Sequence, residues 1–505
     1  MMIPLIRNFA ISVLCSSVFV VASCGGDDEA STDASEECNP LGGPGCLMPW
    51  PSSAYLVEDS SSETGFRVNL PAGAMPVNAD SIAVAPEVFN RYDGFPVAGT
   101  MLAAFETGVS ADGLPPHTDL ARAMEPGASV VVVNMETGEK LPIFAEPDMN
   151  AKVPEERVLL IRPAIRMASK TRYAVGIRNT VKAADGSDLP ISEAFETLLA
   201  GKALKHPLAT NSDTRYQEIF SSLDAVGLPK EELVLAWDFV TASDEFLTED
   251  LLAMRTQALA KMDEQPFTYN VELQRNNNSS QVLRVVAGTY DTPNFLSEPD
   301  KNTSRLVRGA DDLPALQNIG TAKLGALVPK CVETAELPLP VTIFGHGIFG
   351  NARDALENDF LQTLADEQCT VVVGGDWIGL SDQEFAAVAF AMNDINRGAA
   401  LTNKLSQAVV NFIVLQRMLR GPMLTADAFM YEGGGGDSGE ISIASGSFGD
   451  WTNTTDFQLL QNGVFGINLE STNVSLFTIP TDTATVSILV NGVNDTPDAI
   501  DDLYS

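Results

Sequence analysis

A glycine-rich loop is the part of this sequence whose residue types best suit catalysis. It reads Gly345-His-Gly-Ile-Phe-Gly350 and directly follows the hydrophobic run 337–344. In acyl transfer, backbone N–H groups must point at the oxygen that becomes negatively charged, and glycines let the backbone approach that oxygen closely. The loop therefore predicts an oxyanion-binding turn. The same glycines would also suit a strand-to-helix turn without any catalytic role.

The residues around this loop indicate the elements that must position it. The run 337–344 predicts a strand, 352–366 a helix and 369–376 a second buried strand, and an amphipathic helix follows at about 401–420. A strand, a glycine turn, a helix, a strand and a helix in this order are typical of a parallel sheet covered by helices. The segment 331–430 is thus expected to form an α/β unit.

The N-terminus has the features of an export signal. Arg7 precedes the apolar stretch 9–22, which is shorter than a membrane span and ends in Val21-Ala-Ser-Cys24. This ending resembles the bacterial lipobox, and by that resemblance Cys24 is lipidated after residues 1–23 are removed. An uncleaved hydrophobic helix is the alternative. Residues 24–37 are acidic and lack aromatic residues, which predicts a disordered tether.

The region 38–200 has the pattern of strands and turns. The runs 129–134, 157–162 and 172–178 predict short strands, and the segment that ends in the turn Ala183-Ala-Asp-Gly186 resembles bacterial immunoglobulin-like domains. An N-terminal Ig-like β-sandwich is therefore expected. Residues 201–330 contain helical and strand-like runs and are expected to connect this domain to the α/β unit.

Taken together, the lipobox, the Ig-like segment, "FGHGIFG" and "VVVGGDWIGLS" resemble surface lipoprotein lipases and esterases of Gram-negative bacteria, which have the α/β-hydrolase fold. The resemblance implies that the amides of Gly347 and Ile348 form half of an oxyanion hole. It also implies that His346, with Gly345 and Gly350, shapes the loop rather than acting as a base. The substrate would be a carboxylic or lipid ester, which is cleaved through an acyl-serine.

A serine nucleophile would sit on a tight turn between a strand and a helix, with small residues on either side. The pentapeptide 445–449, Ser-Gly-Ser-Phe-Gly, makes Ser447 the candidate, although the residues after it are poor helix formers. Ser438, in Gly436-Asp-Ser-Gly439, is a second serine in a glycine run that is better explained as a linker.

The general base is missing from its expected place. In α/β hydrolases the catalytic histidine follows the serine and the acid along the chain. The three histidines are His117, His206 and His346, and none follows residue 346. His117 and His206 lie in polar, turn-like sequence and are expected in exposed loops. Without a base, a serine hydroxyl stays protonated and is a weak nucleophile. We therefore expect a hydrolase domain that is interrupted after about residue 430 and is catalytically incomplete.

The C-terminal residues differ in character from the rest of the chain. Residues 431–505 begin with a glycine-rich junction, contain no Lys or Arg, and end in an acidic β-type sequence that resembles the last strand of cadherin-like adhesin repeats. Four carboxylates near the end are the only candidate ligands for a metal, which would be Ca²⁺. They are Asp495, Asp498, Asp501 and Asp502. A solvated acidic tail is the alternative, and no other cofactor is expected.

Charge and cysteine content restrict the function further. The chain has 67 acidic and 31 basic residues among 505, a net charge of −36, which repels phosphate backbones and excludes nucleic-acid binding. A lipid-anchored protein works in an oxidising compartment, where disulfides persist. Cys38 and Cys46 are close enough in sequence to close a small loop, and Cys331 and Cys369 could form a second bridge.

The sequence thus predicts mixed β and α/β architecture with an Ig-like β-sandwich, an incomplete hydrolase-like parallel sheet and a short β-rich acidic tail. The expected protein is a bacterial cell-envelope lipoprotein, on the outer membrane or cell surface, whose partners are an ester substrate and the membrane that holds its anchor. The alternative is a non-enzymatic lipoprotein for binding or adhesion, which the absence of a downstream histidine favours.

Overall fold

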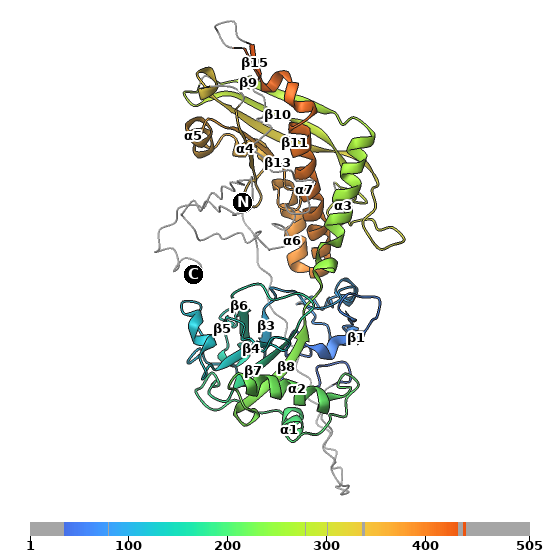
Figure 1. The fold of residues 1–505 in the computed structure, drawn as a ribbon, viewed down its shortest axis with the longest axis vertical. Helices are drawn as coiled ribbons and strands as arrows, with labels where there is room; N and C mark the ends of the chain where they lie inside the picture. The colour runs from blue at the N-terminus through green and yellow to red at the C-terminus, as the bar shows by residue number, and fades with distance from the viewer. Residues whose placement is uncertain are drawn as a thin grey trace, which may run out of the picture. The chain divides into compact units, whose positions relative to one another are not determined.

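A computed structural model describes residues 35–432 and 438–440, apart from 79, 278, 300 and 336–338 (Figure 1). The chain divides into Met1–Asp33, which lies outside the described residues, and one compact unit, Ala34–Ser505. The described part of this unit contains several antiparallel sheets and one mixed sheet of five strands. Its apolar side chains form two large clusters, one before and one after about residue 243.

The first cluster is built from two antiparallel sheets of three strands each. One sheet has the order β3 (Met101–Ala103), β6 (Leu159–Pro163), β5 (Ile143–Pro147), and the other the order β4 (Val130–Asn134), β7 (Arg172–Arg178), β8 (Leu233–Val240). Apolar residues of all six strands share one core. A small hairpin, β1 (Leu56–Glu58) with β2 (Phe66–Val68), lies outside these sheets.

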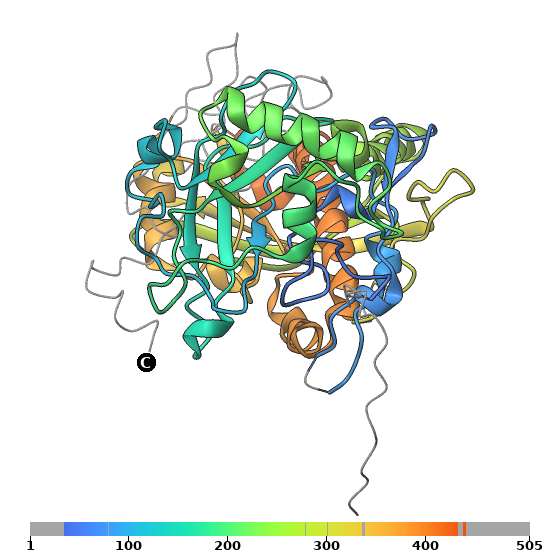
Figure 2. The same ribbon diagram turned by 90° about the horizontal axis from the view of Figure 1, so that it is seen from below.

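A helix covers the outer face of the second sheet. α2 (Ser212–Ala225) packs against β7 and β8, and the short α1 (Glu193–Leu199) packs against α2 (Figure 2). The approach is close because Gly176 has no side chain: a Cβ there would lie 2.8 Å from Leu228 Cδ2 and 3.0 Å from Leu223 Cδ1. Both faces of β8 are consequently covered, and all eight of its residues are buried.

The second cluster surrounds the five-stranded mixed sheet. Its order is β12 (Val341–Phe344), β13 (Val371–Gly375), β11 (Asn318–Pro329), β10 (Val282–Asn294), β9 (Tyr269–Asn276). β12 and β13 are parallel, whereas the other neighbours are antiparallel. Residues 201–330, which the sequence suggested as a connection, are thus divided: β8 belongs to the first cluster, and β9 to β11 belong to the second.

Helices cover both faces of the mixed sheet. α3 (Asp244–Glu264) and α7 (Gly398–Leu419) pack on one face, and α4 (Ala352–Ala355) with α5 (Asp359–Glu367) on the other. Successive side chains of a strand point to opposite faces. Val371 and Val373 accordingly pack with the α3–α7 side, and Val372 packs with the α5 side.

Three further elements complete the described chain. α6 (Phe385–Asn393) contacts α7, and β14 (Met430–Glu432) pairs with β15 (Ser438–Glu440) in a hairpin. Two disulfides, Cys38–Cys46 and Cys331–Cys369, join the two pairs of cysteines that the sequence singled out. Within the described residues, no helix has both the length and the apolar character that a membrane span requires.

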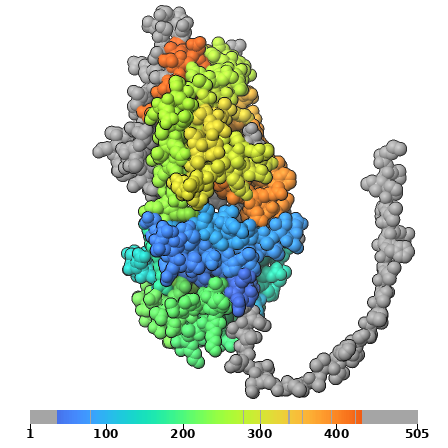
Figure 3. All heavy atoms as spheres, turned by 90° about the vertical axis from the view of Figure 1, so that its right-hand side faces the viewer, coloured from blue at the N-terminus to red at the C-terminus, as the bar shows by residue number. Residues whose placement is uncertain are grey.

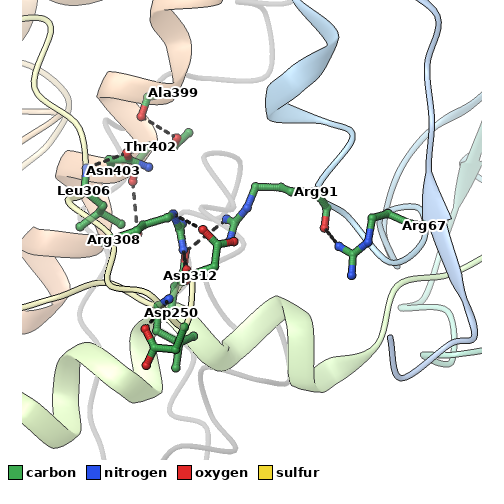
Figure 4. Close-up of polar contacts among 12 residues, drawn as sticks. Arg67, Arg91, Asp250, Leu306, Arg308, Asp312, Ala399, Thr402 and Asn403 are labelled. Carbon is green, nitrogen blue, oxygen red and sulfur yellow. Dashed lines mark hydrogen bonds and ion pairs between the residues drawn. The ribbon is translucent and has the colours of Figure 1, made fainter. Parts of the chain in front are cut away.

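An ion network connects the segment before β3 to α3 and to the loop between β10 and β11. The Arg91 guanidinium lies 3.6 Å from the Asp250 carboxylate on α3 and 3.2 Å from that of Asp312 (Figure 4). Arg308 also contacts Asp250, through two of its nitrogens. Figure 3 shows the segment before β3, in blue, against this loop, in yellow. These contacts tie the second cluster to residues that precede the first sheet.

Candidate functional site

The glycine loop lies where two parallel strands end. Because β12 and β13 run in the same direction, the segments that follow them emerge at one edge of the sheet. These are the loop 345–350 and the segment 376–384, which we call the template segment. Gly350 and Ser381 form a parallel bridge between the two. The crevice outside the carboxyl ends of parallel strands is the usual place for a ligand in such sheets.

His346 is fixed by hydrogen bonds from both of its ring nitrogens. Nδ1 lies 2.8 Å from the carbonyl oxygen of Gly347, and Nε2 accepts from the backbone N–H of Trp377 at 2.8 Å. A carbonyl can only accept and an N–H can only donate, so the ring is neutral with its proton on Nδ1. Its only proton-accepting nitrogen is occupied by Trp377. In this geometry His346 shapes the loop and is not available as a base.

The template segment holds the loop at three further points. The N–H of Phe349 donates to the carbonyl of Leu380 at 2.7 Å, and the N–H of Asp382 donates to the carbonyl of Gly350 at 2.9 Å. Asp376, which is buried, accepts the N–H of Ala352 at the start of α4, at 2.9 Å. The loop is therefore fixed from its second residue to the first turn of the next helix.

Phe349 has a backbone conformation that is unusual for a bulky residue. Its φ of 60° lies in the left-handed region, where a side chain is strained unless the surroundings hold it. Its ring packs edge to face on that of Phe385, with centroids 5.1 Å apart. Strain of this kind is found mainly at functional sites. The two residues before it, Gly347 and Ile348, are exposed.

The two residues that were expected to supply oxyanion donors have free N–H groups. Among the described residues, neither Gly347 nor Ile348 donates its backbone N–H to any acceptor. Both residues are exposed, and a Cβ at Gly347 would meet no atom within 4 Å. Two adjacent N–H groups that have no described acceptor, on exposed residues of a fixed loop, are available to bind an oxygen that carries negative charge.

Exposed apolar side chains occur on the loop and on α6, whose Phe385 packs on Phe349. Ile348 is 56% exposed, Phe385 is 63% exposed and Phe390 is 52% exposed. Ala386 and Ala389 are also exposed, so the exposed residues of α6 from Phe385 to Phe390 are all apolar. The exposed residues at this end of α6 thus form an apolar surface.

Several residues singled out in the sequence lie elsewhere. Cys24, Ser447 and the four aspartates 495, 498, 501 and 502 are outside the described residues. The backbone of Ser438 begins β15. His117 is exposed and packs edge to face on Phe144, and His206 Nδ1 accepts from the N–H of Leu208 at 3.2 Å. Within the described chain, no hydrogen bond joins a histidine ring to a serine hydroxyl.

The sequence did not indicate the roles of Asp376, Trp377, Leu380 and Asp382. The available signal was their position directly after β13, because residues that follow parallel neighbouring strands meet at one edge. In the described residues no group of three or more His, Cys, Asp or Glu side chains could hold a metal ion. No protein-family model matches the sequence, and a search of curated proteins finds no match.

Proposed function

We propose that this chain carries the oxyanion-binding half of a carboxylic ester hydrolase of the α/β-hydrolase type. The observation that carries the proposal is the pair of free N–H groups at Gly347 and Ile348 on a loop fixed by the template segment. Such donors stabilise the carbonyl oxygen as it becomes an oxyanion, and removing one donor from a site of this kind typically slows catalysis by about 10²–10³.

The topology of the mixed sheet supports the hydrolase interpretation. β13 already has neighbours on both sides, β11 and β12, whereas β12 has a described neighbour only on one side. A further parallel strand after α7 would therefore have to join the free edge of β12. The order in which successive strands are added to the sheet would then change direction beside the glycine loop. In open α/β sheets, ligands bind where the strand order reverses in this way. The two three-stranded antiparallel sheets likewise support an Ig-like domain.

A lipid ester is the substrate class that this surface favours. The ester carbonyl would accept hydrogen bonds from Gly347 and Ile348, while its acyl chain would lie along Ile348 and Phe385. Hydrolysis would proceed through an acyl-serine on a nucleophile such as Ser447. The nucleophile must lose its proton to a base, and His346 has no free nitrogen for it. Cleavage by this chain would therefore need either release of Nε2 from Trp377 or a base other than His346.

The engaged ring of His346 favours a second candidate, a surface lipoprotein that binds an ester or carboxylate without cleaving it. Both candidates share the same cellular setting, which we propose is the envelope of a bacterium, with an anchor at Cys24. The two disulfides support an oxidising compartment, because structural disulfides are rare in the cytosol. Ca²⁺ binding by the C-terminal aspartates stays a prediction.

An active-site probe distinguishes the two candidates. The chain from residue 24 onward, with Cys24→Ser to prevent lipidation, is treated with a fluorophosphonate and the modified residue is mapped by mass spectrometry. Labelling of one serine, lost after denaturation, would support the hydrolase. Absence of labelling, beside a control esterase that labels, would contradict it and leave the binding protein. Binding of a non-hydrolysable phosphonate ester, measured by calorimetry, then tests the second candidate.

A further inference from the structure

A buried ion pair lies at the end of the template segment. Lys404 Nζ on α7 contacts both carboxylate oxygens of Glu384, at 2.9 and 3.1 Å. The two residues are 2% and 5% exposed. Among the ion pairs of the described chain, this is the one in which both side chains are buried. A buried pair contributes little net stability, because its attraction is offset by desolvation, but removing one partner leaves an uncompensated buried charge and is strongly destabilising.

The rest of the template segment also rests on α7. Gly379, with a φ of +97°, lies so close to this helix that a Cβ would be 2.8 Å from Leu405 Cδ2 and 3.2 Å from the carbonyl oxygen of Leu401. The ring of Trp377 packs on that of Phe412, with centroids 4.8 Å apart. Residues of α7 between Leu401 and Phe412 thus hold the template segment, and Lys404 of the same helix holds its end.

The same segment holds the glycine loop from the other side. Trp377, Leu380 and Asp382 make the backbone hydrogen bonds that fix His346, Phe349 and Gly350. A displacement of Glu384 would move Asp382, two residues earlier in the chain, and with it the acceptor at Gly350. The contacts therefore form a continuous path from Lys404 through the template segment to Gly347 and Ile348.

From this path we infer that Lys404 and Glu384 are positioning residues for the Gly347 and Ile348 donors. The pair sets the depth at which the template segment lies on α7, and the segment sets the direction of the loop amides. The purpose assigned to these amides rests on the proposed ester-binding function. The inference that Lys404 and Glu384 hold the loop in place does not depend on whether the chain hydrolyses an ester.

The test uses amide hydrogen exchange of the full mature chain with Cys24→Ser. Lys404→Met leaves Glu384 buried without a partner and endangers folding, so the decisive variant is Glu384→Gln with Lys404→Met, which removes both charges. We expect the amides of Phe349, Trp377 and Asp382 to exchange at least about tenfold faster in the double variant, as local opening becomes easier. Amides of β10 and β11 should keep their wild-type rates.

The matched control is Gln407→Met, on the same helix one turn further on. Gln407 is also buried, but its amide donates to Pro293 and Asn411, away from the template segment. We expect this variant to leave the three loop amides within about twofold of wild type, since it disturbs only its own surroundings. The reversed pair, Glu384→Lys with Lys404→Glu, provides a rescue: protection of the loop amides should return in part.

The outcomes separate the two proposals. Unchanged exchange of the loop amides in the double variant would overturn the positioning role, and so would an equal acceleration of every amide in the chain. Fluorophosphonate labelling of the wild-type protein is measured independently. If the loop amides respond but no serine labels, the positioning role stands and the hydrolase proposal fails. If a serine is labelled while the loop amides do not respond, the hydrolase proposal stands and the positioning role fails.

Discussion

The backbone N–H of Trp377 donates to Nε2 of His346 at 2.8 Å, and this bond determines what the histidine can do. A ring whose Nδ1 proton is held by the Gly347 carbonyl and whose Nε2 is occupied cannot take a proton from a serine unless the bond to Trp377 breaks. The most conspicuous histidine in the sequence is therefore part of the loop's framework.

The tautomer of His346 can be measured directly. The chain has three histidines, so a ¹⁵N-histidine spectrum is simple to assign by substitution. We expect one ring at neutral pH to carry its proton on Nδ1, and we expect that signal to be lost in His346→Gln and kept in His117→Asn. A proton on Nε2 of His346 would contradict the hydrogen bond from Trp377.

Two glycines at this edge of the sheet should respond in opposite ways to alanine. Gly347 faces open space, so Gly347→Ala should leave the free energy of unfolding within about 0.5 kcal/mol of wild type. Gly379 has a φ of +97° and packs on α7, so Gly379→Ala should cost about 1–3 kcal/mol. Urea unfolding of both variants checks this. Equal costs would mean that the contacts of Gly379 with α7 do not constrain the backbone.

Asp59 should make the protein's stability depend on acidity. Hydrogen bonds from Ser61 and Arg67 lower the pKa of this carboxyl from 3.8 to about 2. Because the folded pKa is the lower one, the unfolded chain binds the proton first, and the stabilisation is present above the unfolded pKa and lost as pH falls through the folded one. Between about pH 4 and 2, wild type should therefore lose more stability than Asp59→Asn. Parallel slopes in urea unfolding across this range would refute the shift.

The disulfide between Cys331 and Cys369 should stabilise the mixed sheet. It links the turn after β11 to the residues just before β13 and closes a loop with a sequence separation of 38. Restricting the unfolded chain in this way is worth about 3–4 kcal/mol. Replacing both cysteines with serine should lower the free energy of unfolding by that amount, whereas the same change at Cys38 and Cys46, whose separation is 8, should cost less. Thermal unfolding of the two double variants measures the difference.

The dense packing of α2 on its sheet gives a further test. Gly176→Ala would place a Cβ 2.8 Å from the Leu228 side chain, so we expect a loss of about 1–3 kcal/mol from overpacking. Combining it with Leu228→Ala should recover part of this loss, since the smaller residue makes room. If the combined losses were simply additive, the two side chains would not be in conflict.

Local sequence was sufficient for elements with strong apolar patterns. The runs 129–134 and 172–178 became β4 and β7, the run 369–376 became β13, and the helix expected at 401–420 became α7. The expected glycine turn after residue 344 also follows a strand, β12. In these segments the hydrophobic period and the turn residues act within a few positions of each other, so neighbouring residues carry the information.

Other elements depended on distant partners. β11 was not predicted, because a stretch rich in glycine and alanine becomes a strand only when β10 pairs along its whole length. α6 was missed as well, because its apolar residues lie on all sides and show no helical period. β9 and β10 fall among the strand-like runs that were expected within residues 201–330, but their pairing with β11 and β13 in one sheet was not predicted.

The sequence by itself determined that a glycine loop follows a buried strand and that a second such strand and a long helix come next. It also determined that no histidine follows residue 346. Only the tertiary structure decided that residues 376–384 hold this loop, that Trp377 occupies the His346 ring, and that Lys404 pairs with Glu384 beneath them. These are contacts between segments about 20 to 30 residues apart, brought together by the parallel pairing of β12 with β13 and by the packing of α7 on the sheet. No local sequence pattern predicts these contacts, because they form only when the whole sheet buries its apolar side chains.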